Sequence, residues 1–222
     1  MTIRFATVAS TLAITLLAGC ATAEKESAHE QPSSQPSSMQ QYLLTSEDFP
    51  ADTKFQHVNQ EELRKATTSR SAADSDDPEC AARLKIVNVP TTDIDGVNAV
   101  PRQGTLFTNL VLKPQYDRDA VARSVSDRCS KQTATTQGIP VEMTFEEVRT
   151  PIPNTFVLRQ TVTKQADGTT ISSTLVGYAN RRDVTASLTM MVLPEAAASS
   201  ATEADLAEFE KYFAKAVAKV EG

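Results

Sequence analysis

"TFVLRQTVT" at residues 155–163 alternates apolar and polar side chains, as does a β-strand with one buried face. Two stretches of similar character follow it, "TTISSTLVGYA" (169–179) and "VTASLTMMVL" (184–193). The short segments "ADG" and "NRRD" separate the three stretches, and turns of this length join neighbouring antiparallel strands. The sequence therefore predicts an antiparallel meander with one apolar face and one face rich in Ser and Thr.

The alternation also assigns side chains to the two faces of the meander. We expect these apolar residues on the inner face: Phe156, Leu158, Val162, Val184, Ala186, Leu188, Met190 and Val192. The outer face then carries Arg159, Thr161, Ser172, Thr174, Tyr178, Thr185, Ser187 and Thr189. One interpretation of this outer face is a site for a polar ligand or a partner. Its candidate contacts are Arg159, Thr161, Thr174 and Tyr178. An ordinary solvated sheet face would have the same composition.

An amphipathic helix is predicted at the C-terminal end, over residues 203–220. Its apolar stripe consists of Leu206, Phe209, Phe213, Val217 and Val220. Thr202 followed by Asp205 is a helix-capping pattern. We expect this stripe to cover the inner face of the meander, because that is the apolar surface available to it.

Two more strands and several helices are predicted before the meander. The strands are "GTLFTNLVLK" (104–113), ended by Pro114, and "VEMTFEEV" (141–148). Asp77 and Asp117 are helix N-cap candidates, and Thr45 with Asp48 indicates a short capped turn. The helix after Asp77 would bury Cys80, Leu84 and Val87, and the helix after Asp117 would bury Val121, Val125 and Cys129. The expected fold is α+β, with an antiparallel sheet of five or six strands and helices packed mainly on one face.

The N-terminal segment has the pattern of a secretory signal peptide. Arg4 precedes an uncharged run over residues 5–17, and small residues follow it. That run is shorter than the ~20 residues that a membrane-spanning helix needs. "LAGC" at 17–20 resembles the lipobox of bacterial lipoproteins, in which the cysteine thiol receives a diacylglycerol. An ordinary cleavage site with an incidental cysteine is the alternative.

Domain boundaries follow from these assignments. Residues 1–19 are expected to be the lipoprotein signal peptide, and residues 20–40, rich in Ser, Gln and Pro, a disordered linker from a lipid on Cys20. Residues 41–222 are then a single α+β domain. This arrangement predicts a protein held by its lipid at the extracytoplasmic face of the cell membrane.

The assignment of Cys20 bears on the other cysteines, because the chain has only three. With Cys20 modified, Cys80 and Cys129 remain as an even pair in an oxidising compartment. Each is predicted on the buried face of a helix. We therefore expect a disulfide between them, and two buried free thiols are the alternative.

Net charge argues against some classes of partner, and the sequence contains no motif that indicates a catalysed reaction. The formal net charge of −6 argues against nucleic acid or anionic lipid headgroups as main partners. Common hydrolase, metalloprotease and nucleotide-binding motifs do not occur in the sequence. His57 has no metal-ligand neighbour at helical spacing, and "DSDDPE" (74–79) lacks the glycine and distal glutamate of a calcium loop. We predict no catalytic residue, no metal site and no cofactor.

Several features together resemble one family. They are the lipobox, the Ser/Pro-rich linker, the opening "YLLTSEDFP" (42–50), Cys80 shortly after a proline, and Cys129 in mid-domain. In these the chain is similar to exported actinobacterial lipoproteins whose domain resembles the extracellular sensor region of PknH-type kinases. The resemblance implies an antiparallel sheet with helices, a binding cleft and a role in sensing or carrying a ligand. It carries over no catalytic residue.

The function expected from the sequence is that of a non-enzymatic, lipid-anchored envelope protein that binds a small molecule, a lipid or a protein. An accessory subunit that supports envelope assembly or an envelope enzyme is the alternative, and a hydrolase comes third. A ligand carrier requires an apolar cavity between the sheet and the helices. An accessory subunit requires a closed core with an exposed apolar patch.

Overall fold

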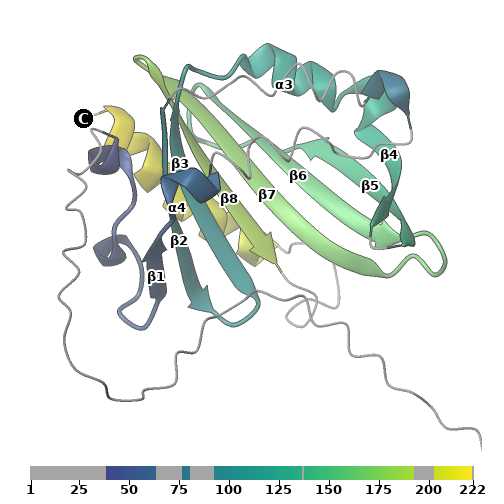
Figure 1. The fold of residues 1–222 in the computed structure, drawn as a ribbon, viewed down its shortest axis with the longest axis horizontal. Coiled ribbons are helices and arrows are strands. Elements are labelled where there is room, and N and C mark those ends of the chain that lie inside the picture. Colours follow the sequence, from purple (N-terminus) through teal and green to yellow (C-terminus); the bar gives the residue numbers. More distant parts are fainter. Residues whose placement is uncertain (1–38, 64–76, 81–92, 137, 193–202, 222) are drawn as a thin grey trace, which may run out of the picture. The chain divides into compact units, whose positions relative to one another are not determined.

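The computed structural model describes residues 39–63, 77–80, 93–136, 138–192 and 203–221. Within them, eight strands form one antiparallel sheet in the order β1-β2-β3-β8-β7-β6-β5-β4 (Figure 1). The strands are β1 (Lys54–His57), β2 (Asp93–Arg102), β3 (Thr105–Lys113), β4 (Lys131–Thr136), β5 (Ile139–Glu147), β6 (Thr155–Lys164), β7 (Thr170–Arg181) and β8 (Val184–Val192). The helical elements are η1 (Gln40–Tyr42), η2 (Ser46–Asp48), α3 (Arg118–Ser124), η4 (Asp127–Ser130) and α4 (Glu203–Glu221), where η denotes a 3₁₀-helix. None of the helices in the described ranges combines the length and apolarity that crossing a membrane requires.

The sheet has more strands than the five or six expected. The predicted strands all form, as β3, β5, β6, β7 and β8. The additional strands are β1, β2 and β4, whose sequences "KFQH", "DIDGVNAVPR" and "KQTATT" lack a clean apolar alternation. Each of them pairs with a neighbouring strand, so inter-strand pairing decides their conformation where local preference is weak.

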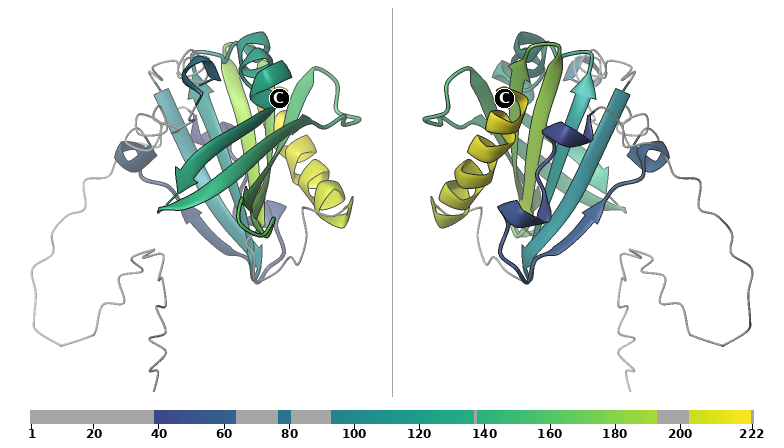
Figure 2. Two further views of the ribbon diagram at one scale, coloured as in Figure 1. Left: turned by 90° about the vertical axis from the view of Figure 1, so that its right-hand side faces the viewer. Right: turned by 90° about the vertical axis from the view of Figure 1, so that its left-hand side faces the viewer.

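The helices lie on both faces of the sheet, whereas the sequence predicted helices mainly on one face (Figures 1 and 2). Val157 packs in the core beneath α4, while Phe156 and Leu158 pack against Val121 of α3. Neighbouring residues of a strand point to opposite faces, so the two helices cover opposite sides of β6. Val162 lies on the same side as Phe156, because the register from 156 to 162 is unbroken. The prediction that Phe156, Leu158 and Val162 share the α4 face is therefore wrong. All three residues at 156–158 are buried, and an apolar run of this kind does not reveal which side each residue faces.

The C-terminal helix α4 packs on the meander as its apolar stripe predicted. Its buried apolar residues are Phe209, Tyr212, Phe213, Ala216, Val217 and Val220. They share one core with the expected inner residues of β8, which are Val184, Ala186, Leu188, Met190 and Val192. Leu206, the first residue of the predicted stripe, is only partly buried. Arg102 of β2 contacts Asp205 at 2.7 Å, near the beginning of the helix.

Helix α4 approaches the sheet closely at Gly177 of β7. A Cβ atom at this position would lie 2.7 Å from the Cζ atom of Phe213, well inside contact distance. Phe213 is fully buried, so its ring has little room to move away. The absence of a side chain at Gly177 therefore allows the helix to lie close to the strand.

The segment 39–49, which begins within the last two residues of the predicted linker 20–40, is part of the core. The folded domain therefore begins slightly earlier than the predicted boundary at residue 41. Met39, Leu43, Leu44 and Phe49 are buried and pack with α4 and the sheet. The backbone N–H of Leu44 donates to Oδ1 of the buried Asn109 at 2.8 Å. The ring of Phe49 stacks on Tyr212 with centroids 4.5 Å apart. Residues 39–49 are therefore held by apolar packing and by a buried hydrogen bond.

A charged contact at Asp48 holds this segment to α4. The Asp48 carboxylate accepts from the backbone N–H of Thr45 at 2.9 Å, which confirms the predicted turn. The Nζ atoms of Lys215 and Lys219 lie 3.7 and 3.4 Å from its oxygens. Burial of Asp48 raises the pKa of its carboxyl, but the Thr45 N–H and the Lys219 charge outweigh burial, so the pKa lies below its ordinary value.

We expect Asp48→Asn to weaken the protein at neutral pH and to have no effect in acid. A depressed carboxyl pKa adds stability above the pKa of the unfolded chain, and that stability is lost as pH falls through the folded pKa. Asparagine keeps an acceptor for Thr45 but removes the charge. Urea unfolding should show a loss of about 1 kcal/mol at pH 7 that is smaller at pH 3 and vanishes once the pH is below the lowered pKa of the folded state. The exposed change Asp52→Asn is the control, and an equal loss at both pH values would contradict the assignment.

Candidate functional site

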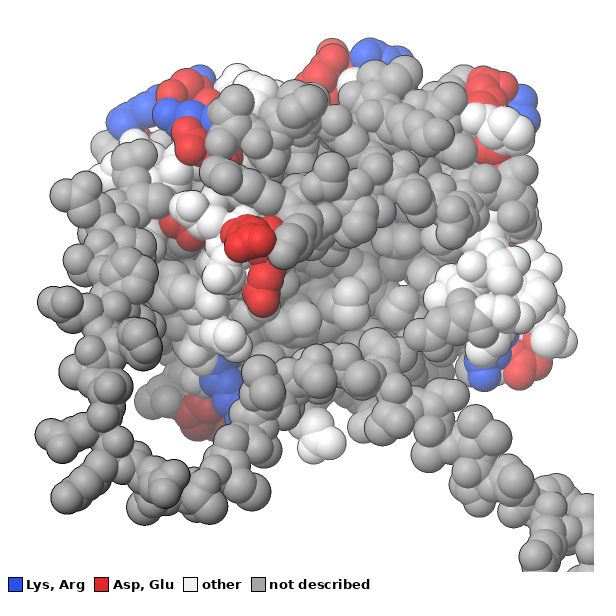
Figure 3. Space-filling model, viewed as in Figure 1, with Lys and Arg blue, Asp and Glu red and all other residues white. Residues whose placement is uncertain are grey.

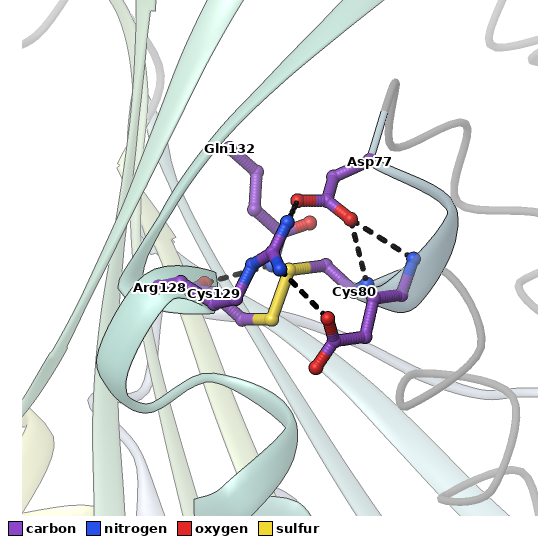
Figure 4. A network of polar contacts seen from close by, with 6 residues as sticks. Asp77, Cys80, Arg128, Cys129 and Gln132 are labelled. Carbon is purple, nitrogen blue, oxygen red and sulfur yellow. Dashed lines mark hydrogen bonds and ion pairs between the residues drawn. A yellow bond between two sulfur atoms is a disulfide. The ribbon is translucent and has the colours of Figure 1, made fainter.

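Cys80 and Cys129 form the expected disulfide, with Cα atoms 5.5 Å apart (Figure 4). Both residues are buried, at 1% and 0% exposure. The helical turn that carries Cys80 begins as predicted, because Oδ1 of Asp77 accepts from the N–H groups of Glu79 at 2.9 Å and Cys80 at 3.4 Å. Leu84 and Val87, the rest of that predicted stripe, lie outside the described residues.

Cys129 lies on η4 and not, as predicted, on the helix that Asp117 caps. The cap itself is confirmed, because Oδ1 of Asp117 accepts from the N–H of Ala120 at 2.9 Å. However, α3 ends at Ser124, and Asp127 has a φ of 52° in the left-handed region. A spacing of four keeps residues on one face only while the helix continues. The chain turns before Cys129, which is why its sulfur reaches Cys80 rather than continuing the α3 stripe.

Arg128 joins the same two turns by charge. Its guanidinium donates to the carboxylates of Asp77 and Glu79, with Nη1 2.7 Å from Oε2 of Glu79 (Figure 4). The hydrogen bond from Arg128 is the main reason why the pKa of the Asp77 carboxyl lies below its ordinary value. Asp77 and Glu79 belong to the acidic stretch 74–79, so at least these two carboxylates serve capping and ion pairing.

A groove lies between α3 and the sheet, on the face opposite α4. Its volume is about 330 Å³. The lining combines apolar and polar side chains: Ala122, Arg123, Val125, Ser126, Ser130, Phe145, Glu147, Phe156 and Leu158. We call it the α3 groove. An apolar floor with a few polar groups is the usual composition of a small-molecule site.

A smaller hollow, which we call the tyrosine notch, adjoins α3 near its beginning. It measures about 30 Å³ and is lined by Tyr116, Arg118, Val121, Asn154, Phe156, Tyr178 and Asn180. The Tyr116 and Tyr178 rings meet edge to face at 5.7 Å. Asn180 supports this wall, because its Nδ2 donates to the carbonyl of Tyr116 at 2.7 Å and its Oδ1 accepts from Thr185 at 2.6 Å.

The four residues predicted as ligand or partner contacts do not share one face. Arg159 pairs across the sheet with Leu175, and Thr161 with Ser173, so both lie on the α4 side. Thr174 and Tyr178 pair with Gln160 and Phe156 on the α3 side. Of the four, Tyr178 lines the tyrosine notch, while Arg159 contacts Glu146 at 3.2 Å.

Charged side chains on the visible face are mixed in sign. In Figure 3 the described Lys and Arg residues lie singly or beside Asp and Glu, mostly towards the rim of the view.

His57 ends the edge strand β1, and its ring meets Phe55 edge to face at 5.8 Å. Within the described ranges no three His, Cys, Asp or Glu side chains gather as metal ligands would. Cys20 and most of the predicted linker lie outside the described residues.

The residues that line the two hollows were not identified as site residues from the sequence, apart from Tyr178. Phe145 and Phe156 read as strand residues, and Val121 and Val125 as a buried helical stripe. Arg118 follows the Asp117 cap and carries no motif of its own. Tyr116, the aromatic residue directly before the Asp117 cap, was only a weak indication of a binding site in the sequence. The hollows depend on how α3 lies against β5 and β6, which no local pattern records.

Comparison with known proteins gives remote structural likenesses. No family model matches the chain, and no curated protein matches it. A solved structure of an uncharacterised protein from Mycobacterium smegmatis is 14% identical, with a TM-score of 0.48 over 80% of this chain and 93% of that one. The extracellular domain of PknH from Mycobacterium tuberculosis is 17% identical, with a TM-score of 0.38 over 59% of this chain and 64% of that one. Neither likeness assigns the chain to a family.

Proposed function

We propose that this chain is a non-enzymatic binding protein of the cell envelope, anchored by a lipid on Cys20, and that it binds a small amphipathic molecule in the α3 groove. The α3 groove is the observation that supports this proposal. Its volume of about 330 Å³ is large enough for a small ligand. It also lies between a helix and the sheet, where a ligand carrier requires its cavity.

The lining of the α3 groove suits an amphipathic molecule. Val125, Phe156 and Leu158 are buried apolar residues that form part of its wall and floor. Arg123 and Glu147 add charge, and the Ser126 and Ser130 hydroxyls add smaller polar groups. An apolar ligand surface would lose water against the first set at ~25 cal/mol per Å² buried. Polar groups of the ligand would find partners in the second set.

The alternative, an accessory subunit, has less support. That function requires a contiguous apolar patch on the surface. Among the described residues the only large hydrophobic side chain that is exposed is Ile139, at 43%. It lies at the tip of the β4–β5 hairpin, and one residue does not make a patch. Ligand binding in the α3 groove is therefore the function that we propose.

Filling the groove should abolish binding of a small apolar probe. We expect wild-type protein to bind the neutral fluorophore N-phenylnaphthylamine saturably, with one site per chain. Ala122→Trp places an indole in the groove and should weaken this binding at least about tenfold, since it removes the apolar contacts of the probe. Fluorescence titration measures the affinity.

The matched control is Ala120→Trp, because Ala120 is also half-buried on α3 but lines neither hollow. It should bind the probe as the wild type does. Binding that is absent in the wild type, or equally strong in both variants, would refute the proposed site.

The anchor is tested separately. Cys20→Ser removes the thiol that would receive the diacylglycerol, so no acyl chain can hold the protein in the bilayer. We expect the variant to move from the membrane pellet to the soluble fraction, while wild type stays in the pellet after a salt wash. Immunoblotting of the two fractions measures the distribution. A Cys20→Ser protein that still pelleted with washed membranes would show that anchoring does not depend on Cys20.

A further inference from the structure

We propose that the ligand is a small monocarboxylate, with its apolar body in the α3 groove and its carboxylate in the tyrosine notch, where Arg118 binds it. This inference rests on the proposed function, because it names the ligand class of the same groove. Three observations carry it. The two hollows adjoin, their sizes differ as a body and a headgroup would, and no residue in the described ranges pairs with Arg118.

The α3 groove and the tyrosine notch share one wall. Phe156 lines both hollows. Consecutive residues of α3 continue the wall from one to the other, because Val121 lines the notch and Ala122 lines the groove. The two hollows therefore lie next to each other along α3, and the proposed ligand spans them.

The volumes of the hollows fit the two parts of an amphipathic molecule. The α3 groove, at about 330 Å³, has roughly twice the volume of the ~150 Å³ engineered cavity that holds benzene. The tyrosine notch, at about 30 Å³, has room for a group of only a few atoms. A carboxylate is such a group, and a second ring or chain is not.

The charge of the tyrosine notch is positive. Arg118 is its only charged lining residue, and no described residue makes a hydrogen bond or an ion pair with the Arg118 guanidinium. By contrast, Arg102, Arg128, Arg159 and Arg181 each contact a carboxylate. A guanidinium offers two parallel N–H donors in the geometry of a carboxylate. Arg118 is thus available to a ligand in a way that the paired arginines are not.

The other lining residues fit a ligand with a single carboxylate. Asn154 lines the notch, and its side-chain amide can donate a second hydrogen bond to a carboxylate there. The α3 groove carries one residue of each sign, Arg123 and Glu147, so its lining adds no net charge for a second anionic group. The net positive charge of the two hollows therefore lies in the notch, which matches a monocarboxylate.

The test compares three ligands with the same eight-carbon chain as competitors of bound N-phenylnaphthylamine. They are octanoate, octanol and octyltrimethylammonium at neutral pH. We expect octanoate to displace the probe about tenfold or more better than octanol, because a charge-assisted hydrogen bond adds to the same apolar contact. Octyltrimethylammonium should be no better than octanol.

Arg118→Gln should bring octanoate within about twofold of octanol, with the two displacement constants compared within the same variant. Arg149→Gln is the matched control, because Arg149 is also exposed and has no ion-pair partner among the described residues, but lines neither hollow. It should keep the preference for octanoate. Circular dichroism checks that both variants are folded.

The outcomes separate the two proposals. Equal displacement by octanoate and octanol in the wild type, or a preference for octanoate that survives in Arg118→Gln, overturns the carboxylate inference and leaves the groove as a binding site. Stronger displacement by the ammonium compound also overturns it. Absence of probe binding in the wild type refutes the proposed function itself.

Discussion

Loss of the Cys80–Cys129 disulfide should lower the free energy of unfolding by about 4 kcal/mol on the chain-entropy model. The bond closes a loop of 49 residues, and without it the unfolded chain gains the conformations that this loop closure excludes. A loss of this size is a large part of the 5–15 kcal/mol that typical domains have. Part of the loop, residues 81–92, lies outside the described residues, but the entropy argument needs only its length.

The measurement is urea unfolding of Cys80→Ser/Cys129→Ser in a Cys20→Ser background, which removes the lipid and leaves no other cysteine. The control is the Cys20→Ser protein with its disulfide intact. We expect a lower midpoint and a slightly larger dependence on urea, because the unfolded chain becomes less compact. A difference below about 1 kcal/mol would mean that the folded segments hold together without the bond. The Arg128 contacts to Asp77 and Glu79 are the candidates for that role.

Phe213→Ala should be destabilising by about 3–5 kcal/mol, the range for removing a buried phenylalanine ring. The ring is fully buried between α4 and β7, where it lies against Gly177. The cost combines lost apolar burial with the cavity that remains. Thermal or urea unfolding of the single variant measures it.

A second variant shows whether the glycine is required by this ring. Gly177→Ala should cost about 1–3 kcal/mol in the wild-type background, because its methyl group would press on the Phe213 ring. In the Phe213→Ala background the same change should cost less than about 1 kcal/mol, since the ring is absent and the methyl fills part of the cavity. Additive losses would show that Gly177 is needed for another reason. The control is Ala179→Gly, at a buried position two residues further along β7. Gly168→Ala does not serve as a control, because Gly168 has a positive φ of 70°.

The sequence predicted elements best where a pattern is long and regular. The C-terminal helix, the meander and the caps at Thr45, Asp77 and Asp117 all form as expected. A cap is a contact within three residues, and an amphipathic stripe repeats along the helix, so both are encoded locally. The pairing of Cys80 with Cys129 followed from counting cysteines, which does not require a structure.

The errors of the sequence-based prediction arise where the local pattern is ambiguous or is interrupted. The strands β1, β2 and β4 are set by pairing with neighbours, and their own sequences are ambiguous. The side of β6 on which Phe156 lies depends on which helix packs there, because residues 156–158 are all buried. The break before Cys129 comes from the turn at Asp127.

The sequence by itself determined the cysteine pairing and the helix that closes one face of the sheet. The location that its signal and lipobox patterns indicate stays a prediction. Signal, lipobox and capping patterns are short, so a single stretch of chain carries each of them. The tertiary structure alone decided that α3 covers the opposite face, that Tyr178 and Arg118 line one hollow together with Phe156, and that a groove remains between α3 and β5–β6. A hollow is formed by surfaces distant in sequence, and its shape depends on their packing, which no local pattern specifies.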